Sequence, residues 1–125
     1  MSVKRILIVD DSPSVRQQVG LALKQVGFEV VDGVDGIDGA EKVRKDASIG
    51  MVICDINMPR LNGLDMVEQV KSEARFAKLP IVMLTSEDNP ALVERAKKAG
   101  AKGWIIKPFR ADLLVATVRK LMAAA

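Results

Sequence analysis

Residues 6–11 read Ile-Leu-Ile-Val-Asp-Asp, an apolar run that ends at two adjacent carboxylates. Four more short apolar runs follow along the chain, at residues 28–31, 51–54, 81–84 and 104–106. Continuous runs of this length, rich in isoleucine and valine, are typical of strands buried on both faces of a parallel sheet. We therefore predict five strands at these positions.

Segments with helical spacing of apolar residues separate the runs. Ser12 and Pro13 fit the cap and the first position of a helix, and Gly27 fits its stop. Asn89 and Gly100 bound the fourth predicted helix in the same way. The predicted inward-facing residues of the five helices are, in order, Val15, Val19, Leu23 and Val26; Ala40, Val43 and Ala47; Leu64, Val67 and Val70; Leu92, Ala96 and Ala99; and Leu114, Val118 and Leu121.

Alternation of strand and helix predicts an α/β fold of the (βα)5 type. We expect one doubly wound, five-stranded parallel sheet with helices on both faces, giving three α/β/α layers. With 125 residues the chain has room for a single domain, over residues 1–125. The 49% hydrophobic and 28% charged residues exclude a disordered chain.

The composition excludes several classes of function. The chain has no histidine, which removes Ser-His-Asp and Cys-His catalysis and histidine metal sites. Cys54 is the single cysteine, so no intrachain disulfide can form, and we interpret it as an inert core residue. Aromatic residues make up only 3%, which argues against nucleic-acid binding by base stacking. The apolar runs fall far short of the roughly 20 residues of a membrane span. We therefore expect a cytoplasmic protein without membrane insertion.

Polar residues follow four of the five predicted strands. Asp10 and Asp11 follow the first, Asp55 the third, Thr85 the fourth and Lys107 the fifth. In open α/β sheets, ligands bind at the edge formed by the carboxyl ends of the strands. We therefore expect these side chains to converge on one site.

Three carboxylates at one site repel one another, by about 4 kcal/mol per pair at ~4 Å and an effective dielectric near 20. Lys107 alone supplies too little positive charge, whereas Mg²⁺ takes carboxylate, water and phosphate oxygens. Aspartate can act as a nucleophile toward phosphoryl groups. Asp55 beside a metal on Asp11, with Lys107 and Thr85 to neutralise phosphoryl oxygens, suits formation of an aspartyl phosphate.

Together these motifs resemble the receiver domain of bacterial two-component response regulators, of the stand-alone chemotaxis type. The resemblance covers essentially the whole chain. It implies a flavodoxin-like strand order of 2-1-3-4-5. The segments that carry it are residues 6–11, 55–59, 84–86, 99–101 and 107–109.

The resemblance implies a role for each candidate residue near the phosphoryl group. Asp55 would be the phosphoacceptor, Thr85 would swing toward the phosphoryl group, and Lys107 would pair with it. The peptide bond between Lys107 and Pro108 would be cis. The phosphoryl donor would be a sensor histidine kinase acting in trans.

The resemblance also implies how the metal is held. Asp11, Asp55 and the backbone carbonyl of Asn57 would bind Mg²⁺ directly, and Asp10 would act mainly through metal-bound water. The side chains of Asn57 and Glu87 would flank the site and are compatible with rapid self-dephosphorylation.

The expected output is a switch built from Thr85 and Trp104, where Trp104 stands in place of the usual Tyr or Phe. Its indole is larger and has only an N–H donor. A protein target would bind the face formed by the fourth helix, fifth strand and fifth helix. The chain would then be a monomeric signalling receiver, which catalyses only its own phosphorylation and dephosphorylation.

Other functions stay open from the sequence. Chemotaxis or motility is the favoured pathway, and a phosphorelay or developmental adaptor is the alternative. A small Mg²⁺-dependent phosphohydrolase could also use an aspartate nucleophile, although such enzymes usually carry a second Asp where Asn57 stands. A nucleotide- or flavin-binding module of the same architecture is the third class. Asp10 and Asp11 would repel its phosphate unless a metal intervened.

Overall fold

The structure is a computed structural model that describes residues 4–124. Strands and helices alternate along it, with one short 3-10 helix, η1, before the fourth strand. The elements are β1 (Arg5–Val9), α1 (Pro13–Lys24), β2 (Glu29–Gly33), α2 (Gly36–Lys45), β3 (Ile49–Cys54), α3 (Gly63–Lys71), η1 (Ala74–Phe76), β4 (Ile81–Thr85), α4 (Pro90–Ala99), β5 (Gly103–Ile106) and α5 (Ala111–Ala124).

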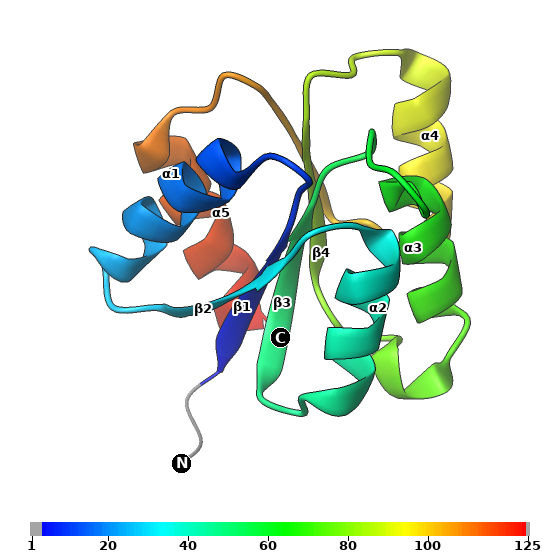
Figure 1. Ribbon diagram of the computed structural model, residues 1–125, viewed down its shortest axis with the longest axis horizontal. Helices are drawn as coiled ribbons and strands as arrows, with labels where there is room; N and C mark the ends of the chain where they lie inside the picture. The colour runs from blue at the N-terminus through cyan, green and yellow to red at the C-terminus, as the bar shows by residue number, and fades with distance from the viewer. Residues whose placement is uncertain (1–3, 125) are drawn as a thin grey trace.

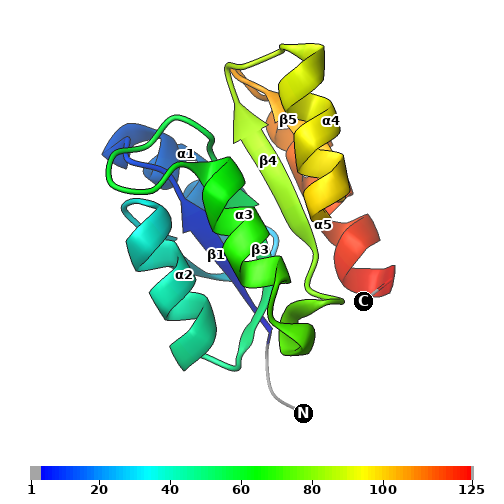
Figure 2. The same cartoon turned by 90° about the vertical axis from the view of Figure 1, so that its right-hand side faces the viewer.

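The five strands form one parallel sheet in the order β2-β1-β3-β4-β5. Helices α1 and α5 cover one face, and α2, α3 and α4 cover the other (Figures 1 and 2). The predicted fold class, its three layers and the strand order 2-1-3-4-5 are therefore confirmed. Within residues 4–124, none of the helices combines the length and the apolar character that a membrane span needs.

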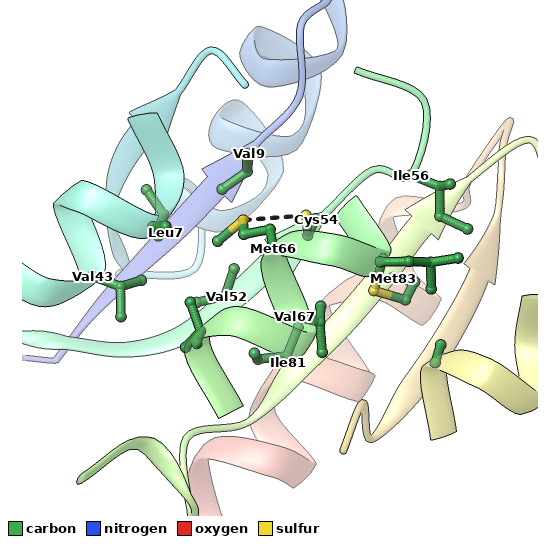
Figure 3. Close-up of a cluster of buried hydrophobic side chains, with 14 of the residues drawn as sticks. Leu7, Val9, Val43, Val52, Cys54, Ile56, Met66, Val67, Ile81 and Met83 are labelled. Atoms are coloured by element: carbon green, nitrogen blue, oxygen red, sulfur yellow. Dashed lines mark hydrogen bonds between the residues drawn. The ribbon is translucent and has the colours of Figure 1, made fainter. Parts of the chain in front are cut away.

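Each face of the sheet carries its own hydrophobic cluster. Successive residues of β1, β3 and β4 alternate between the two clusters, and this explains why their sequences are continuously apolar. The cluster under α2, α3 and α4 includes Leu7, Val9, Val43, Val52, Met66, Val67 and Met83 (Figure 3). The cluster under α1 and α5 includes Ile6, Ile8, Leu23, Ile53, Leu84 and Leu114.

Cys54 lies in the core, as predicted. Its Sγ is 3.7 Å from Sδ of Met66 (Figure 3), and it is fully buried. Burial raises the pKa of the Cys54 thiol, which keeps it protonated and unreactive.

Three details of the predicted elements are wrong at their margins. Helix α1 ends at Lys24 because the chain turns at Gly27, whose φ is 93°, so Val26 is 37% exposed rather than inward-facing. The edge strands β2 and β5 are only partly buried, and Ile106 is 42% exposed, because an edge strand has a neighbour on one side only. Helix α2 ends at Lys45, so Ala47 is exposed rather than inward-facing. The cause is Asp46, whose carboxylate accepts the backbone N–H of Ser48 in a turn that stops the helix.

Side-chain caps start α1, α2, α3 and α4, which lead away from the upper edge of the sheet in Figure 1. Ser12 caps α1 and Asn89 caps α4, as predicted, and Gly100 ends α4 in the left-handed conformation. Asp35 caps α2 and Asn62 caps α3, and neither cap was predicted from the sequence. These caps fix where each helix begins after the loops that carry the polar residues.

Candidate functional site

Four charged side chains meet at the carboxyl edge of the sheet. Asp10, Asp11 and Asp55 each place one carboxylate oxygen within 4.8 Å of the others. Asp10 and Asp55 are buried, whereas Asp11 is exposed. Nζ of Lys107 lies 2.9 Å from Oδ2 of Asp10 and 3.2 Å from Oδ2 of Asp55. The structure thus brings these four candidate residues together, with the Lys107 ammonium shared by Asp10 and Asp55 and with Asp11 beside these two carboxylates.

Strand register sets the positions of the two buried carboxylates. Val9 of β1 pairs with Cys54 of β3, and the N–H of Asp55 donates to the carbonyl of Val9 at 2.9 Å. Asp10 and Asp55 therefore leave adjacent strands at the same level. In each carboxylate, Oδ1 accepts a backbone N–H, from Ser12 for Asp10 and from Ile56 for Asp55. Both Oδ2 atoms are left to face Lys107.

The β4 and β5 ends supply Thr85 and Lys107. Thr85 pairs with Ile106 in the sheet, and the N–H of Lys107 donates to the Thr85 carbonyl at 2.9 Å. Thr85 is fully buried, and its hydroxyl accepts the N–H of Glu87. The peptide bond before Pro108 is cis, as expected. Thr85 and Lys107 are therefore held on neighbouring strands beside the acidic group.

Glu87 links the loops around the site. Nδ2 of Asn57 donates to Oε1 of Glu87 at 3.0 Å, and Nε1 of Trp104 donates to the backbone carbonyl of Glu87 at 3.0 Å. Trp104 is half-buried and also packs against the core cluster under α2, α3 and α4. Trp104 thus both packs and joins β5 to the loop that follows Thr85.

Burial and charge shift the ionisation of the site in opposite ways. Desolvation raises the pKa of Asp10, although hydrogen bonds from Lys107 and Ser12 oppose the shift. Burial alone would lower the pKa of Lys107, but its hydrogen bonds to Asp10 and Asp55 and their charges raise it overall. Lys107 therefore stays charged at neutral pH, where its ammonium is shared by the carboxylates of Asp10 and Asp55.

The donor set suits an oxygen-bound divalent cation. The group offers three carboxylates close enough to share one ion, and a single lysine leaves their charge incompletely neutralised. Exposure of Asp11 keeps one side open to water. Mg²⁺ retains several water ligands and binds through one or two carboxylates, so these residues fit it.

The raised pKa of Asp10 predicts a pH dependence of stability in the metal-free protein. Folded Asp10 keeps its proton to a higher pH than unfolded Asp10, whose pKa is near 3.8. In the window above 3.8 the native state binds more protons, so the Asp10 contribution to the free energy of unfolding falls as pH rises. Urea unfolding in EDTA should show a wild-type stability that declines relative to Asp10→Asn across this window. A stability difference that does not change with pH would contradict the prediction.

Arg16 supports the site and was missed by sequence reasoning. Its Nη1 donates to the backbone carbonyl of Asp10 at 2.6 Å, and its Nε donates to Asp32 at 3.2 Å. A signal was available, since a cation near a helix N-terminus is unfavourable unless something else holds it. Arg60 and Asp35 also form an ion pair, and nothing in the sequence around either residue indicated that they would pair.

Comparison with known proteins places the chain in a family. Residues 6–119 match the response regulator receiver domain, so the chain belongs to this family of two-component signalling proteins. Its relatives include the chemotaxis protein CheY1 of Helicobacter pylori. The two are 40% identical over 111 residues, covering 88% of this chain and 90% of the relative.

Solved structures agree with this assignment. The chemotaxis protein CheY4 of Vibrio cholerae superimposes with a TM-score of 0.88 at 35% identity, covering 95% of this chain and 98% of that one. A CheY-like receiver domain from Methanospirillum hungatei gives a TM-score of 0.92 at 24% identity over 98% and 96% of the two chains, which shows the shared fold.

Proposed function

We propose that residues 1–125 form one monomeric receiver domain. Its Asp55 accepts a phosphoryl group from a sensor histidine kinase, and this phosphorylation switches the domain between two states. The observation that carries the proposal is the buried pair Asp10 and Asp55 sharing the ammonium of Lys107 beside exposed Asp11. Phosphoryl transfer requires a positioned nucleophile. The Asp55 carboxylate is held in place at the end of a central strand by its sheet bond to Val9 and by the N–H of Ile56.

Four residues are proposed to hold Mg²⁺. Asp11, Asp55 and the backbone carbonyl of Asn57 would hold it directly, and Asp10 would act mainly through metal-bound water. When bound, the ion neutralises charge on the phosphoryl oxygens. The acidic group of Asp10, Asp11 and Asp55 supports this assignment, because its carboxylates are close enough to share one cation.

The remaining residues bind the phosphoryl group during and after its transfer. An Asp55 oxygen attacks the phosphorus, the new O–P bond forms, and the P–N bond to the kinase imidazole breaks with its electrons leaving on nitrogen. Lys107, already 3.2 Å from Asp55, can turn its ammonium to the phosphoryl oxygens. The Thr85 hydroxyl uses its oxygen to accept from Glu87, so its hydrogen is available to a phosphoryl oxygen. Asn57 and Glu87 flank the route by which water reaches the phosphoryl group.

The output is proposed to pass from Thr85 to Trp104. The phosphoryl group adds nearly two negative charges. Movement of Thr85 toward it would break the bond from the Glu87 N–H, and the Glu87 carbonyl is the acceptor for Trp104. The α4-β5-α5 face would then bind its protein target. Ile106 of β5 and Leu113 of α5 are exposed apolar residues on elements of this face.

A phosphodonor experiment tests the proposal. Acetyl phosphate with Mg²⁺ should add one phosphoryl group to the wild type by intact mass spectrometry and change Trp104 fluorescence. Asp55→Asn and addition of EDTA should each abolish both changes. Glu29→Gln, at an exposed carboxylate that begins β2 at the opposite edge of the sheet, is the matched control and should behave as wild type. Labelling that persists in Asp55→Asn would defeat the assignment, and multiple turnover on a phosphate ester would favour a phosphohydrolase.

We propose a chemotaxis or motility pathway, because the relatives at 34–40% identity are named chemotaxis proteins. A pull-down that compares the phosphorylated protein with Asp55→Asn distinguishes the alternatives. Capture of a flagellar motor component supports this pathway, whereas capture of a histidine phosphotransfer protein supports a phosphorelay.

A further inference from the structure

Arg60 adopts an unusual backbone conformation in the loop after the proposed phosphoacceptor. Its φ is 65°, and it is the one non-glycine residue with positive φ among those that the structure describes. Residues other than glycine rarely adopt this left-handed backbone conformation, and those that do are held in it by their surroundings. The contacts of Arg60 show what holds it.

The Arg60 guanidinium makes a two-pronged ion pair with Asp35. Nε lies 2.6 Å from Oδ2 and Nη2 lies 3.1 Å from Oδ1. Asp35 is only 5% exposed and is itself fixed, because its Oδ1 also accepts the N–H of Asp38 as the cap of α2. Such fork-to-carboxylate pairs set geometry as well as charge. The hydrogen bond from Arg60 also lowers the pKa of Asp35.

A backbone bond reinforces the same attachment. The N–H of Gly36, at the start of α2, donates to the carbonyl of Leu61 at 3.1 Å. At the base of the loop, the N–H of Gly63 donates to the carbonyl of Ile56 at 2.9 Å. The loop is thus fastened at its base and again at Arg60 and Leu61, and Asn57 lies between these two attachments.

We infer that Arg60 is a positioning residue, which fixes the backbone carbonyl of Asn57 at the metal site through its pair with Asp35. The inference rests on the proposed function, since it takes that carbonyl as a Mg²⁺ ligand. Arg60 itself is 57% exposed and need not touch the ion or the phosphoryl group. Its effect passes through the shape of the loop.

Three variants separate the ion pair from backbone strain and from the helix cap. Arg60→Gly removes the pair, while glycine accepts the positive φ without strain. Asp35→Asn removes the charge, while asparagine still caps α2. The double variant completes a mutant cycle. The matched control is Arg44→Ala, which breaks the pair between Arg44 and Glu73 at 2.7 Å, away from the carboxyl edge.

Mg²⁺ affinity is measured from the rise in melting temperature over a MgCl₂ titration at constant ionic strength. Hydrogen exchange of residues 56–62 in EDTA supplies a readout without metal. Each single variant should bind Mg²⁺ about tenfold more weakly, as for the loss of other partners that orient metal ligands. Each should also exchange faster in this loop, and the double variant should be no weaker than either single variant. Arg44→Ala should match wild type.

Wild-type Mg²⁺ affinity in Arg60→Gly and Asp35→Asn, or fully additive effects in the double variant, would overturn the inference. A wild type that binds Mg²⁺, shows the predicted variant effects and yet takes no phosphoryl group would overturn the proposed function and leave this inference standing.

Discussion

Replacing Lys107 with methionine is expected to destabilise the metal-free protein by about 2–3 kcal/mol at neutral pH. Removing one partner of a fully buried ion pair costs about 3–5 kcal/mol. The expected loss of stability for Lys107→Met is smaller because Lys107 is partly exposed. Loss of its ammonium leaves Asp10 and Asp55 facing each other without a shared cation. The pKa of Asp10, already raised by burial, should rise further.

Urea unfolding in EDTA measures this effect. Lys102→Met, at an exposed lysine just before β5, is the control and should change stability by less than about 0.5 kcal/mol. The double variant Lys107→Met/Asp10→Asn should recover much of the loss, because one of the two opposed charges is gone. A Lys107→Met protein as stable as wild type would show that the lysine does not hold the carboxylates together.

Gly63→Ala should cost about 3 kcal/mol or more and disturb the phosphoacceptor. A Cβ added at Gly63 would lie 1.8 Å from the carbonyl oxygen of Asp55 and 3.0 Å from Cα of Ile56. Both contacts are with backbone, so the chain that carries Asp55 must shift. Overpacking of this kind typically costs about 1–3 kcal/mol and occasionally more, and main-chain atoms cannot relax by changing rotamer.

The matched control is Gly20→Ala in helix α1. Its Cβ would meet only Val30 at 3.7 Å and Ile8 at 3.9 Å, which are ordinary contacts. Alanine is favoured over glycine in a helix by roughly 1 kcal/mol, so this variant should be as stable as wild type or more stable. Urea unfolding and phosphorylation by acetyl phosphate are measured for both variants. Wild-type stability and labelling of Gly63→Ala would rule out the close packing of α3 on Asp55.

The fold and the meeting of the four charged residues could be predicted because both depend on local pattern and on parallel topology. Burial on both faces leaves β1, β3 and β4 continuously apolar, and that pattern is visible in the sequence. Once the strands are parallel, residues that follow them must share one edge. Asp10, Asp55 and Lys107 are therefore found together although they are far apart in the chain.

The supporting contacts could not be predicted because they depend on the shapes of loops. Arg60 reaches Asp35 only when its backbone takes a left-handed conformation, and nothing in residues 56–62 specifies that turn. The bond from Trp104 to Glu87 ends on a backbone carbonyl, which every residue carries. Such an acceptor leaves no trace in residue type, so only the three-dimensional structure identifies it.

The Asp55 side chain is expected to form an acyl phosphate. Borohydride reduces an acyl phosphate to an alcohol, so it converts a phosphorylated aspartate to homoserine, which peptide mass spectrometry locates. After treatment with acetyl phosphate and Mg²⁺, homoserine is expected at residue 55. Samples treated without Mg²⁺ should contain no homoserine at any position. Homoserine at Asp10 or Asp11 with residue 55 unchanged, or a borohydride-resistant phosphate on Thr85 or Ser86, would contradict it.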